Sequence, residues 1–465
     1  MLGNLDKTLE KLLWPRSVAV IGASRDPRKL GYLILDNILR YGFQGRVYPV
    51  NPGASPVLGV TAYANVMSVP DTIDLAVIVV PAPAVEPVLE SCGIKKVQAV
   101  AIISAGFGEV GAEGAVLQQK LVNIAKAHGI RILGPNSLGI LNTTHHLNAS
   151  FAVGMPKEGG VAVMTQSGAV ATAILDWARV VDLGFSQFVS LGNTADIDEI
   201  DLLQAWATDP HCKVIAGYLE GIRNGRVFLE SARFASARRP VVLMKVGNSA
   251  SGAAAALSHT GALAGEDKIL DAAFRQAGVI RAYTMEELFD LALAFACSPL
   301  PPGRRIVILT NAGGPGVMAV DAMERSGLAL SALSTDLQAR LRSLVPQAAS
   351  MDNPVDLRGD ATAMGYQSAL EQLLADDDVD GVIVLLTPQR VTEPQVVARS
   401  IMHLARQASK PVLSVYMGGA TFALGRKMLG AAGLPVYPYP ERAVRAMAAL
   451  SSYAEYRRSL TECLE

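Results

Sequence analysis

The stretch SVAVIGASRDPRKLG, residues 17–31, predicts a buried strand, a tight turn that contains glycine, and the start of a helix. Its apolar run has no polar alternation, which is typical of a parallel strand covered on both faces. Similar runs, separated by segments of helical length, recur in GRVYPVNP (45–52), LAVIVVP (75–81), VQAVAIIS (97–104) and IRILGPN (130–136). Residues 1–145 are therefore predicted to form a doubly wound α/β domain.

Two more series of strand, turn and helix follow. Residues 146–297 have runs of the same kind in GVAVMTQSGAV (160–170), FSQFVSLGN (185–193), KVIAGYLEG (213–221), PVVLMKVG (240–247) and VIRAY (279–283). After a proline-rich link at 298–303, residues 303–465 continue with RRIVILTNAGGPG (304–316), DGVIVLLTP (380–388) and KPVLSVYMGG (410–419). The predicted fold class is α/β, with three doubly wound parallel-sheet domains. Ligands of such sheets bind where the strands end.

Composition excludes several classes of partner. The 465 residues include 41 basic and 42 acidic ones, so no overall field attracts nucleic acid or a membrane surface. No apolar run reaches the roughly 18 residues of a membrane span, and the N-terminus has no signal-peptide core. The four cysteines have no metal-binding spacing. We expect a soluble, cytoplasmic protein without a metal site of its own.

The first turn, Gly22 to Gly31, is suited to a phosphate, because helix N-termini present free N–H groups. It lacks GxGxxG, and the second strand ends at Asn51-Pro52 without the carboxylate of an NAD site. A nucleotide-like ligand other than NAD is therefore favoured, with cations from Arg25, Arg28 and Lys29. The alternative is that Gly22 only permits a tight turn.

Small-residue turns also follow the later strands of the first domain. They are VVPAP (79–83), ISAGFGE (103–109) and GPNSLG (134–139), and together they predict a groove along one sheet edge. The second and third domains open with TQSGA (165–169) and NAGGPG (311–316). Both helix starts could face one phosphoryl group, although each alone is also an ordinary turn, and nothing in the sequence places them opposite each other.

Two ionisable residues complete the candidate site. Glu220 closes an apolar strand, where it could hold a histidine ring, although a glutamate there is often simply solvated. His259 lies in SHTGALAG (258–265), a segment of small residues that an imidazole could move within, although alone it could be incidental. Gly192, Asn193 and Asp196, at another strand end of the second domain, are candidates for contacting a polar substrate or for closing the site.

Together these motifs identify a family. The chain resembles the α subunit of NDP-forming acyl-CoA synthetases of the ADP-forming acetate–CoA ligase type, in the succinyl-CoA synthetase superfamily. The likeness runs nearly end to end, through VAVIGAS, SAGFGE, GPNSLG, TQSGA, LGN, YLEGI, SHTGALAG, TNAGGPG and NPVDL (353–357). It implies a Rossmann-like CoA-binding domain (1–145), a ligase domain with the histidine loop (146–297) and a third, flavodoxin-like domain (303–465).

The resemblance also implies residue roles. His259 would be the phosphorylated catalytic residue and Glu220 its stabilising partner. Gln166, Ser167, Gly168, Gly313 and Gly314 would bind phosphate. The CoA groove would be lined by Gly22, Ser24, Lys29, Asn51, Val80, Pro81 and Ser104, and the acyl group would lie near Asn136, Gly192 and Asn193. The reaction implied is reversible: a carboxylic acid, CoA and ATP yield acyl-CoA, ADP and phosphate.

One family module has no counterpart in the sequence. No stretch predicts the ATP-grasp module, which holds ATP or ADP and Mg²⁺, so we expect a separate ATP-grasp β subunit and a hetero-oligomer. The first alternative is a catalytically silent protein that binds CoA or acyl-CoA for regulation, although such a sensor would not need His259 and Glu220. The second, an NAD-dependent dehydrogenase, is disfavoured by the absent carboxylate after the second strand.

Overall fold

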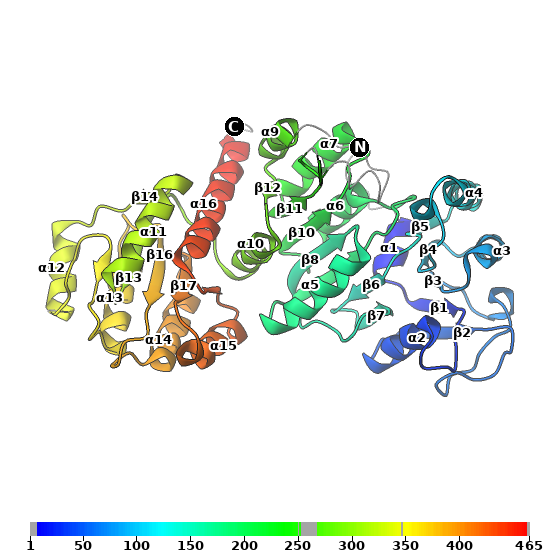
Figure 1. The fold of residues 1–465 in the computed structure, drawn as a ribbon, viewed down its shortest axis with the longest axis horizontal. Coiled ribbons are helices and arrows are strands. Elements are labelled where there is room, and N and C mark those ends of the chain that lie inside the picture. Colours follow the sequence, from blue (N-terminus) through cyan, green and yellow to red (C-terminus); the bar gives the residue numbers. More distant parts are fainter. Residues whose placement is uncertain (1–6, 250, 253–266, 346, 463–465) are drawn as a thin grey trace. The chain divides into compact units, whose positions relative to one another are not determined.

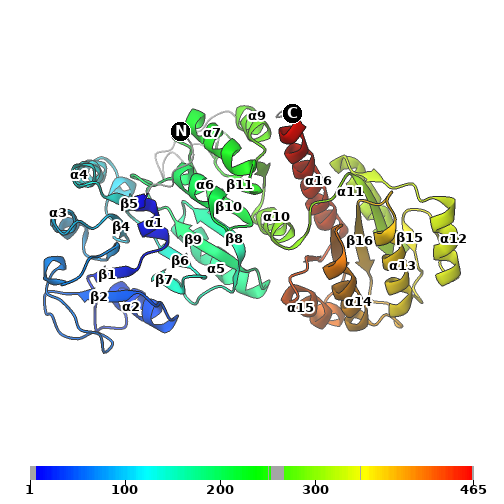
Figure 2. The same ribbon diagram turned by 180° about the vertical axis from the view of Figure 1, so that it is seen from behind.

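The computed structural model describes residues 7–249, 251–252, 267–345 and 347–462, and it divides into two compact units, 1–283 and 284–465. The first unit contains two sheets and the second unit contains one (Figure 1). Each sheet has helices on its faces, as the view from behind also shows (Figure 2). The predicted α/β class with three doubly wound sheets is confirmed.

The first sheet is entirely parallel, in the order β2-β1-β3-β4-β5. It consists of β1 (Ser17–Ile21), β2 (Arg46–Val50), β3 (Leu75–Ile78), β4 (Ala99–Ile102) and β5 (Arg131–Leu133). Four helices flank it: α1 (Lys7–Leu13), α2 (Leu30–Arg40), α3 (Ala82–Ile94) and α4 (Ala112–His128). All five strands run in the same direction, but the order in which they are added reverses at β1: β2 lies on one side of it, and β3, β4 and β5 lie on the other. The turns after the neighbouring strands β1 and β3 therefore lie side by side.

Two glycines make the first turn possible. Gly22 has φ +98°, and a Cβ there would lie 2.3 Å from the Val79 carbonyl oxygen at the end of β3. Gly31, in the first turn of α2, comes so close to the preceding loop that a Cβ would lie 2.0 Å from the Gly22 carbonyl oxygen. The strand end and the helix start are therefore in backbone contact, which any side chain would prevent.

The second sheet is mixed, with the order β12-β11-β10-β8-β9-β6-β7. Its parallel part comprises β8 (Glu158–Thr165), β9 (Phe185–Ser190), β10 (Val214–Leu219), β11 (Val241–Lys245) and β12 (Ile280–Arg281). The helices are α5 (Gly168–Val180), α6 (Glu199–Thr208), α7 (Gly225–Ser236) and α9 (Asp267–Ala277). The strands expected between residues 160 and 283 are all present.

The antiparallel edge of this sheet was not predicted. β6 (Gly139–Asn142) and β7 (Leu147–Ser150) form a hairpin whose first strand pairs antiparallel with β9. A connection of four residues can join only antiparallel neighbours, because a parallel pair needs a long crossover. The expectation of a wholly parallel second sheet is therefore wrong at this edge, and the domain border predicted after residue 145 falls inside the hairpin.

Side chains tie the first two sheets into one unit. The buried Asn37 amide of α2 donates to the carbonyl oxygens of Ser150 (2.8 Å) and Ala152 (3.0 Å). Arg131 in β5 pairs with Asp196 and Asp201, which follow β9. Apolar residues from both sheets form one continuous core. The turns at the ends of both sheets are consequently fixed relative to each other.

The second unit has its own parallel sheet and core. The order is β14-β13-β16-β17-β18, with β15 beside β13. The strands are β13 (Arg305–Thr310), β14 (Ala329–Leu330), β15 (Val355–Asp356), β16 (Gly381–Leu386), β17 (Val412–Tyr416) and β18 (Val436–Tyr437). The helices are α11 (Gly313–Ser326), α12 (Thr335–Leu344), α13 (Ala363–Ala375), α14 (Pro394–Gln407), α15 (Ala423–Ala431) and α16 (Pro440–Glu462).

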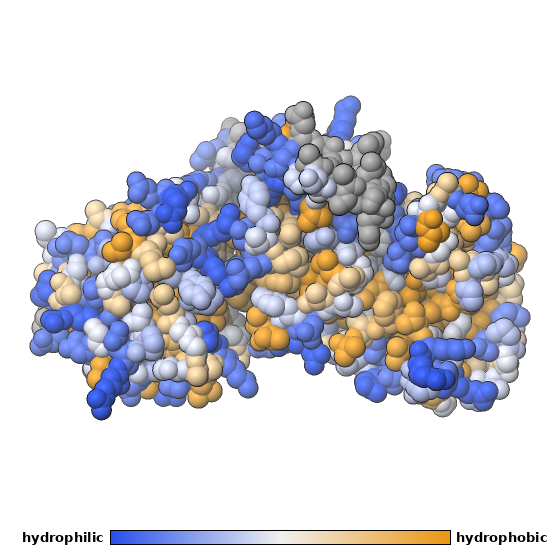
Figure 3. All heavy atoms as spheres, in the orientation of Figure 1, coloured by the Kyte–Doolittle hydropathy of each residue, from blue (hydrophilic) through white to orange (hydrophobic). Residues whose placement is uncertain are grey.

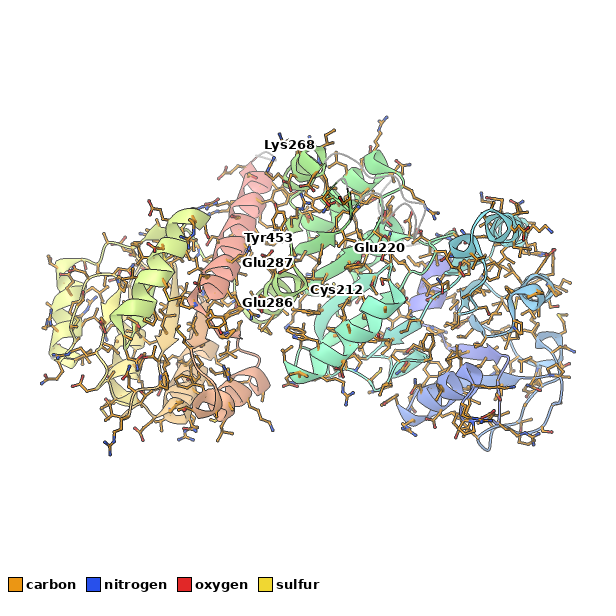
Figure 4. The ribbon with its side chains drawn as sticks, viewed as in Figure 1. Cys212, Glu220, Lys268, Glu286, Glu287 and Tyr453 are labelled. Carbon is orange, nitrogen blue, oxygen red and sulfur yellow. The ribbon has the colours of Figure 1, made fainter. Side chains whose placement is uncertain are left out.

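Helix α10 (Met285–Cys297) falls in the second compact unit and packs against α16. Arg442 of α16 donates to both carboxylate oxygens of the largely buried Asp290, at 2.6 and 2.7 Å. Phe295 packs edge-on against Tyr453 of α16, and Figure 4 shows the two helices together. The proline-rich link after α10 therefore lies within the second unit.

Hydrophilic residues cover most of the helices on the face drawn in Figure 3, and hydrophobic ones gather over the first sheet. Among the helices that the structure describes, none is both long and apolar enough to cross a membrane.

We expect Gly31→Ala to destabilise the first unit by about 2 kcal/mol, the typical cost of forcing a methyl group into a filled space. All three tryptophans lie within residues 1–283, so urea unfolding followed by tryptophan fluorescence reports this unit alone. Gly225→Ala is the control, because a Cβ at that helical position meets no atom within 4 Å. Equal unfolding midpoints for the two variants would contradict the close approach.

Candidate active site

The residues predicted to line a CoA groove lie at neighbouring strand ends of the first sheet. Gly22 and Ser24 follow β1, Asn51 follows β2, and Val80, Pro81 and Ser104 follow β3 and β4. Lys29 is exposed and immediately precedes α2. The structure therefore brings these residues to one edge. Whether they bind CoA stays a prediction.

A cavity of about 250 Å³ opens between the ends of β1 and β2, lined by Ala23, Ser24, Arg25, Asp26, Asn51, Gly53, Ser55 and Val57. The Asn51 amide donates to the Ala23 carbonyl oxygen (2.8 Å), and its oxygen accepts from the Gly53 N–H (2.9 Å). Ser24 Oγ accepts from the Asp26 N–H (3.1 Å). Asn51 thus fixes the shape of both walls.

Arg28 was expected to offer a cation to a phosphate, but in the structure it is paired with a carboxylate. Its Nε and Nη2 donate to the two Asp26 carboxylate oxygens at 3.0 and 3.1 Å. Hydrogen bonds from Arg28 also lower the pKa of Asp26. The exposed Arg28 guanidinium is thus paired with Asp26, whereas Arg25 and Lys29 are further exposed cations next to the cavity.

Asn136, Gly192 and Asn193, predicted near the acyl group, lie together where the two sheets meet. The Asn193 N–H donates to the Pro135 carbonyl oxygen (2.9 Å), and the Asn136 amide donates to Asn193 Oδ1 (3.3 Å). Gly192 has φ +59°, and a Cβ there would lie 2.3 Å from the Pro135 oxygen. The Asn136 N–H donates to the Ser104 carbonyl oxygen (3.0 Å), which joins this cluster to the groove.

Glu109 was not singled out from the sequence, although it closes the quoted motif ISAGFGE. Its carboxylate accepts from Asn193 Nδ2 (2.5 Å) and from the N–H groups of Gly106 and Phe107. Burial opposes ionisation, but these hydrogen bonds hold the pKa of Glu109 below its usual value. Asn193 Nδ2 also donates to Gln118 Oε1 (2.9 Å), so the Asn193 side chain is firmly oriented.

Asp196 has a different role from the one expected. It accepts from Arg131 Nε (3.1 Å) and from the Ile132 N–H (2.7 Å). Both donors belong to the first sheet, so Asp196 joins the two sheets and is not directed at a substrate.

The helix starts at Ser167-Gly168 and Gly313-Gly314 are built alike. In each, a buried threonine ends the strand, and its hydroxyl oxygen accepts from the N–H two residues on: Thr165 from Ser167 (3.1 Å), and Thr310 from Ala312 (3.0 Å). Gly168, Gly313 and Gly314 are exposed. The two starts lie in different units, so their facing a common phosphoryl group stays a prediction.

Gln166, predicted to bind phosphate, uses its side chain to hold the turn after β10. Its Oε1 accepts from the N–H groups of Glu220 (2.6 Å) and Gly221 (2.9 Å), and its Nε2 donates to the Gly221 carbonyl oxygen (3.0 Å). The amide therefore fixes the backbone that carries Glu220. A phosphate contact by the Gln166 side chain would break this arrangement.

Glu220 directly follows β10, and Figure 4 shows it at the opposite end of this strand from Cys212. Burial raises the pKa of the neighbouring Tyr218, and the Glu220 charge adds to this effect. Lys245, at the end of the adjacent β11, has a lowered pKa because of burial and the charge of Arg281, which Glu220 partly offsets. Glu220 thus stands among ionisable groups at one sheet edge. His259 lies outside the described residues.

Glu199, the first residue of α6, was missed as a site residue because it looks like an ordinary helix start. It is only 2% exposed, and its Oε2 accepts from Gln166 Nε2 (3.3 Å). Burial, and secondarily the adjacent Asp198, raise the pKa of Glu199 to about 7. Among the described residues, no group of histidines, cysteines and carboxylates could hold a metal ion.

Three family models match successive parts of the chain. They are a CoA binding domain (residues 16–143), a succinyl-CoA ligase like flavodoxin domain (158–295) and a ligase-CoA domain (306–461). The α subunit of ADP-forming acetate–CoA ligase I from Pyrococcus furiosus is 42% identical over 97% of this chain and 98% of its own. The ADP-forming acetate–CoA ligase of Methanocaldococcus jannaschii is 44% identical over 97% of this chain, which spans only 64% of that relative.

A solved structure agrees along the whole chain. The dinucleotide-forming acetyl-coenzyme A synthetase 1 of Candidatus Korarchaeum cryptofilum, in complex with phosphate and ADP, superimposes with a TM-score of 0.95 and 40% identity, covering 98% of this chain and 99% of that one. Fold and matches together define an acid–thiol ligase. The chain belongs to the α subunits of the NDP-forming acyl-CoA synthetase family, as its motifs predicted.

We expect the stability of Glu199→Gln relative to the wild type to rise with pH. The raised pKa means that the folded protein binds the Glu199 proton more tightly than the unfolded chain does. The protonated carboxyl therefore stabilises the fold below about pH 4.5, and this advantage is lost as the pH rises through about 7. The relative gain of the variant between pH 5 and pH 8 should reach about 3 kcal/mol at most, at about 1.4 kcal/mol per pH unit.

Urea unfolding followed by tryptophan fluorescence at both pH values measures this gain. Glu230→Gln, which neutralises a half-exposed carboxylate on α7, is the control and should show no such trend. A constant difference between Glu199→Gln and the wild type would contradict the raised pKa.

Proposed function

We propose that the chain is the α subunit of an ADP-forming acyl-CoA synthetase that works through an acyl-phosphate and a phosphohistidine at His259. The observation that carries this is the edge of the second sheet, where Glu220 is held through Gln166 beside the helix start at Ser167-Gly168. A carboxylate next to an anion-ready helix start is what a phosphorylated imidazole needs: one group orients the ring and the other accommodates the phosphoryl charge.

The proposed reaction has three reversible steps. A nitrogen of His259 attacks the γ-phosphorus of ATP, and ADP leaves. An oxygen of the carboxylic acid then attacks the phosphorus, so the P–N bond breaks and an acyl-phosphate forms. Finally the CoA thiol, losing its proton, attacks the acyl carbon and releases phosphate. Glu220 would accept a hydrogen bond from the second ring nitrogen of His259 and so direct the first towards phosphorus.

Gln166, Ser167, Gly168, Gly313 and Gly314 are proposed to bind the phosphoryl group, because N–H groups at helix starts such as those at Ser167-Gly168 and Gly313-Gly314 would stabilise its charge. CoA would lie along Gly22, Ser24, Lys29, Asn51, Val80, Pro81 and Ser104, and the acyl group near Asn136, Gly192 and Asn193. The orientation of Asn193 by Glu109 and Gln118 supports a rigid acyl site. A small carboxylic acid is the proposed substrate.

ATP, ADP and Mg²⁺ would bind to a partner. We propose an ATP-grasp β subunit in a hetero-oligomer, located in the cytoplasm. The Pyrococcus relative is named as an α subunit, and the Methanocaldococcus relative extends well beyond the matched region, which supports a further module outside this chain.

Labelled ATP should give an acid-labile phosphoprotein when the chain is co-produced with an ATP-grasp subunit. We expect His259→Ala to abolish the label, because no other imidazole is proposed as the phosphoryl acceptor. His211→Ala is the matched control, because that ring lies against Trp14 away from β10's carboxyl end. If His259→Ala kept the label, the phosphohistidine assignment would be wrong.

The chain alone should bind CoA in calorimetry. We expect Lys29→Ala to weaken binding by about fivefold, less at high salt, because an exposed cation facing a phosphate contributes on the order of 1 kcal/mol. Arg40→Ala, at the other end of α2, pairs with Asp36 and is the control. CoA binding without turnover with any ATP-grasp partner would favour the silent regulatory alternative.

A further inference from the structure

Three loops at the carboxyl edge of the second sheet are cross-linked by side chains. They follow β8 (Gln166), β9 (residues 191–199) and β10 (residues 220–224). The Gln166 amide bonds to the loop after β10, and the Arg223 guanidinium bonds from that loop to the loop after β9. A third side chain, Glu199, bonds to Gln166. The proposed phosphoryl site lies among these loops.

The Gln166 amide uses its full hydrogen-bonding capacity in one orientation. Its oxygen accepts from two backbone N–H groups, at Glu220 and Gly221, and its nitrogen donates to the Gly221 carbonyl oxygen and to Glu199 Oε2. If the amide were flipped, its NH2 group would face the N–H groups of Glu220 and Gly221. Its oxygen would face the Gly221 carbonyl oxygen and the Glu199 carboxylate. The bond to Glu199 links this arrangement to α6.

Arg223 makes a second link. Its guanidinium donates to the carbonyl oxygens of Thr194 (2.5 Å) and Asn193 (2.9 Å), so the loop after β10 is tied to the loop after β9. The charges that act on Glu199 are the Asp198 carboxylate on its own helix and this Arg223 guanidinium from the facing loop. The buried Glu199 carboxylate therefore bonds to Gln166 and is acted on by the charge of Arg223.

We propose that Glu199 is a positioning residue for phosphoryl transfer, which fixes the Gln166 amide and through it the backbone that carries Glu220. The ionised carboxylate is purely an acceptor, so it stabilises the orientation in which Gln166 donates to α6 and accepts from the Glu220 and Gly221 N–H groups. Protonation weakens that hydrogen bond and loosens the turn. The proposal rests on the proposed function, since it concerns the residue that would orient the phosphohistidine.

The test uses the chain in complex with its co-produced ATP-grasp subunit, and measures the single-turnover rate of phosphoryl transfer from labelled ATP. Glu199→Asp keeps the charge but shortens the reach to Gln166, and we expect it to slow transfer by about tenfold, as does Gln166→Ala. The double variant should be no slower than either single variant, because both act through one link. Glu199→Gln can still accept from Gln166, so we expect it to stay within about threefold of the wild type.

The pH profile separates positioning from mere support of the fold. The ratio of the wild-type rate to the Glu199→Gln rate should rise as the pH passes through about 7, where Glu199 ionises, whereas the ratio for the surface control Glu230→Gln should stay constant. If Glu199→Asp does not fold, the comparison of the wild type with Glu199→Gln still tests the proposal. A ratio of these two rates that does not change with pH would overturn it.

Two other outcomes also overturn it: Glu199→Asp transferring at the wild-type rate, or effects of Glu199→Asp and Gln166→Ala that multiply. These are distinguishable from failure of the proposed function. If His259→Ala kept the label, the phosphohistidine itself would be refuted. If only His259→Ala lost it while Glu199→Asp behaved as the wild type, the positioning role alone would be refuted.

Discussion

The direction of the strands is the constraint on which the candidate site depends. Parallel strands end at one edge of a sheet, and each strand there must turn into a helix within a few residues. The turns are therefore crowded, and glycines such as Gly22 and Gly192 let one backbone approach another where a side chain would not fit. This crowding gathers N–H groups, amides and carboxylates from distant parts of the sequence into one place.

At the strand ends of the first two sheets, several polar side chains are bonded to neighbouring loops. Asn51, Gln166 and Asn193 each bond to the backbone or to a carboxylate of a neighbouring loop. They act mainly by holding the loops in shape, whereas the exposed Gly168 and Gly313 begin the helices at which an anion is proposed to bind. A rigid site of this kind suits a phosphoryl group, because preoriented donors need not reorganise during transfer.

The turns that follow Thr165 and Thr310 have the same hydrogen-bonding pattern in both units. Thr165 and Thr310 are buried at the last position of a strand, and each hydroxyl bonds to the backbone two residues on. The same side chain thereby ends the strand and shapes the helix start. The two helix starts arise in different units with the same local geometry, which supports their proposed common role.

Buried valine-rich runs and glycine turns were sufficient to predict the three sheets, because local hydropathy and backbone freedom determine such elements. The strand-end positions of Gly22, Asn51, Glu220 and Gly313 followed from the same pattern. The same pattern did not predict the β6–β7 hairpin, the pairing of Arg28 with Asp26 or the burial of Glu199. Each of these depends on contacts between residues distant in sequence or on a local geometry that the composition does not reveal. Only the tertiary structure could decide which polar side chains hold the loops at the strand ends together, because their partners come from distant parts of the sequence.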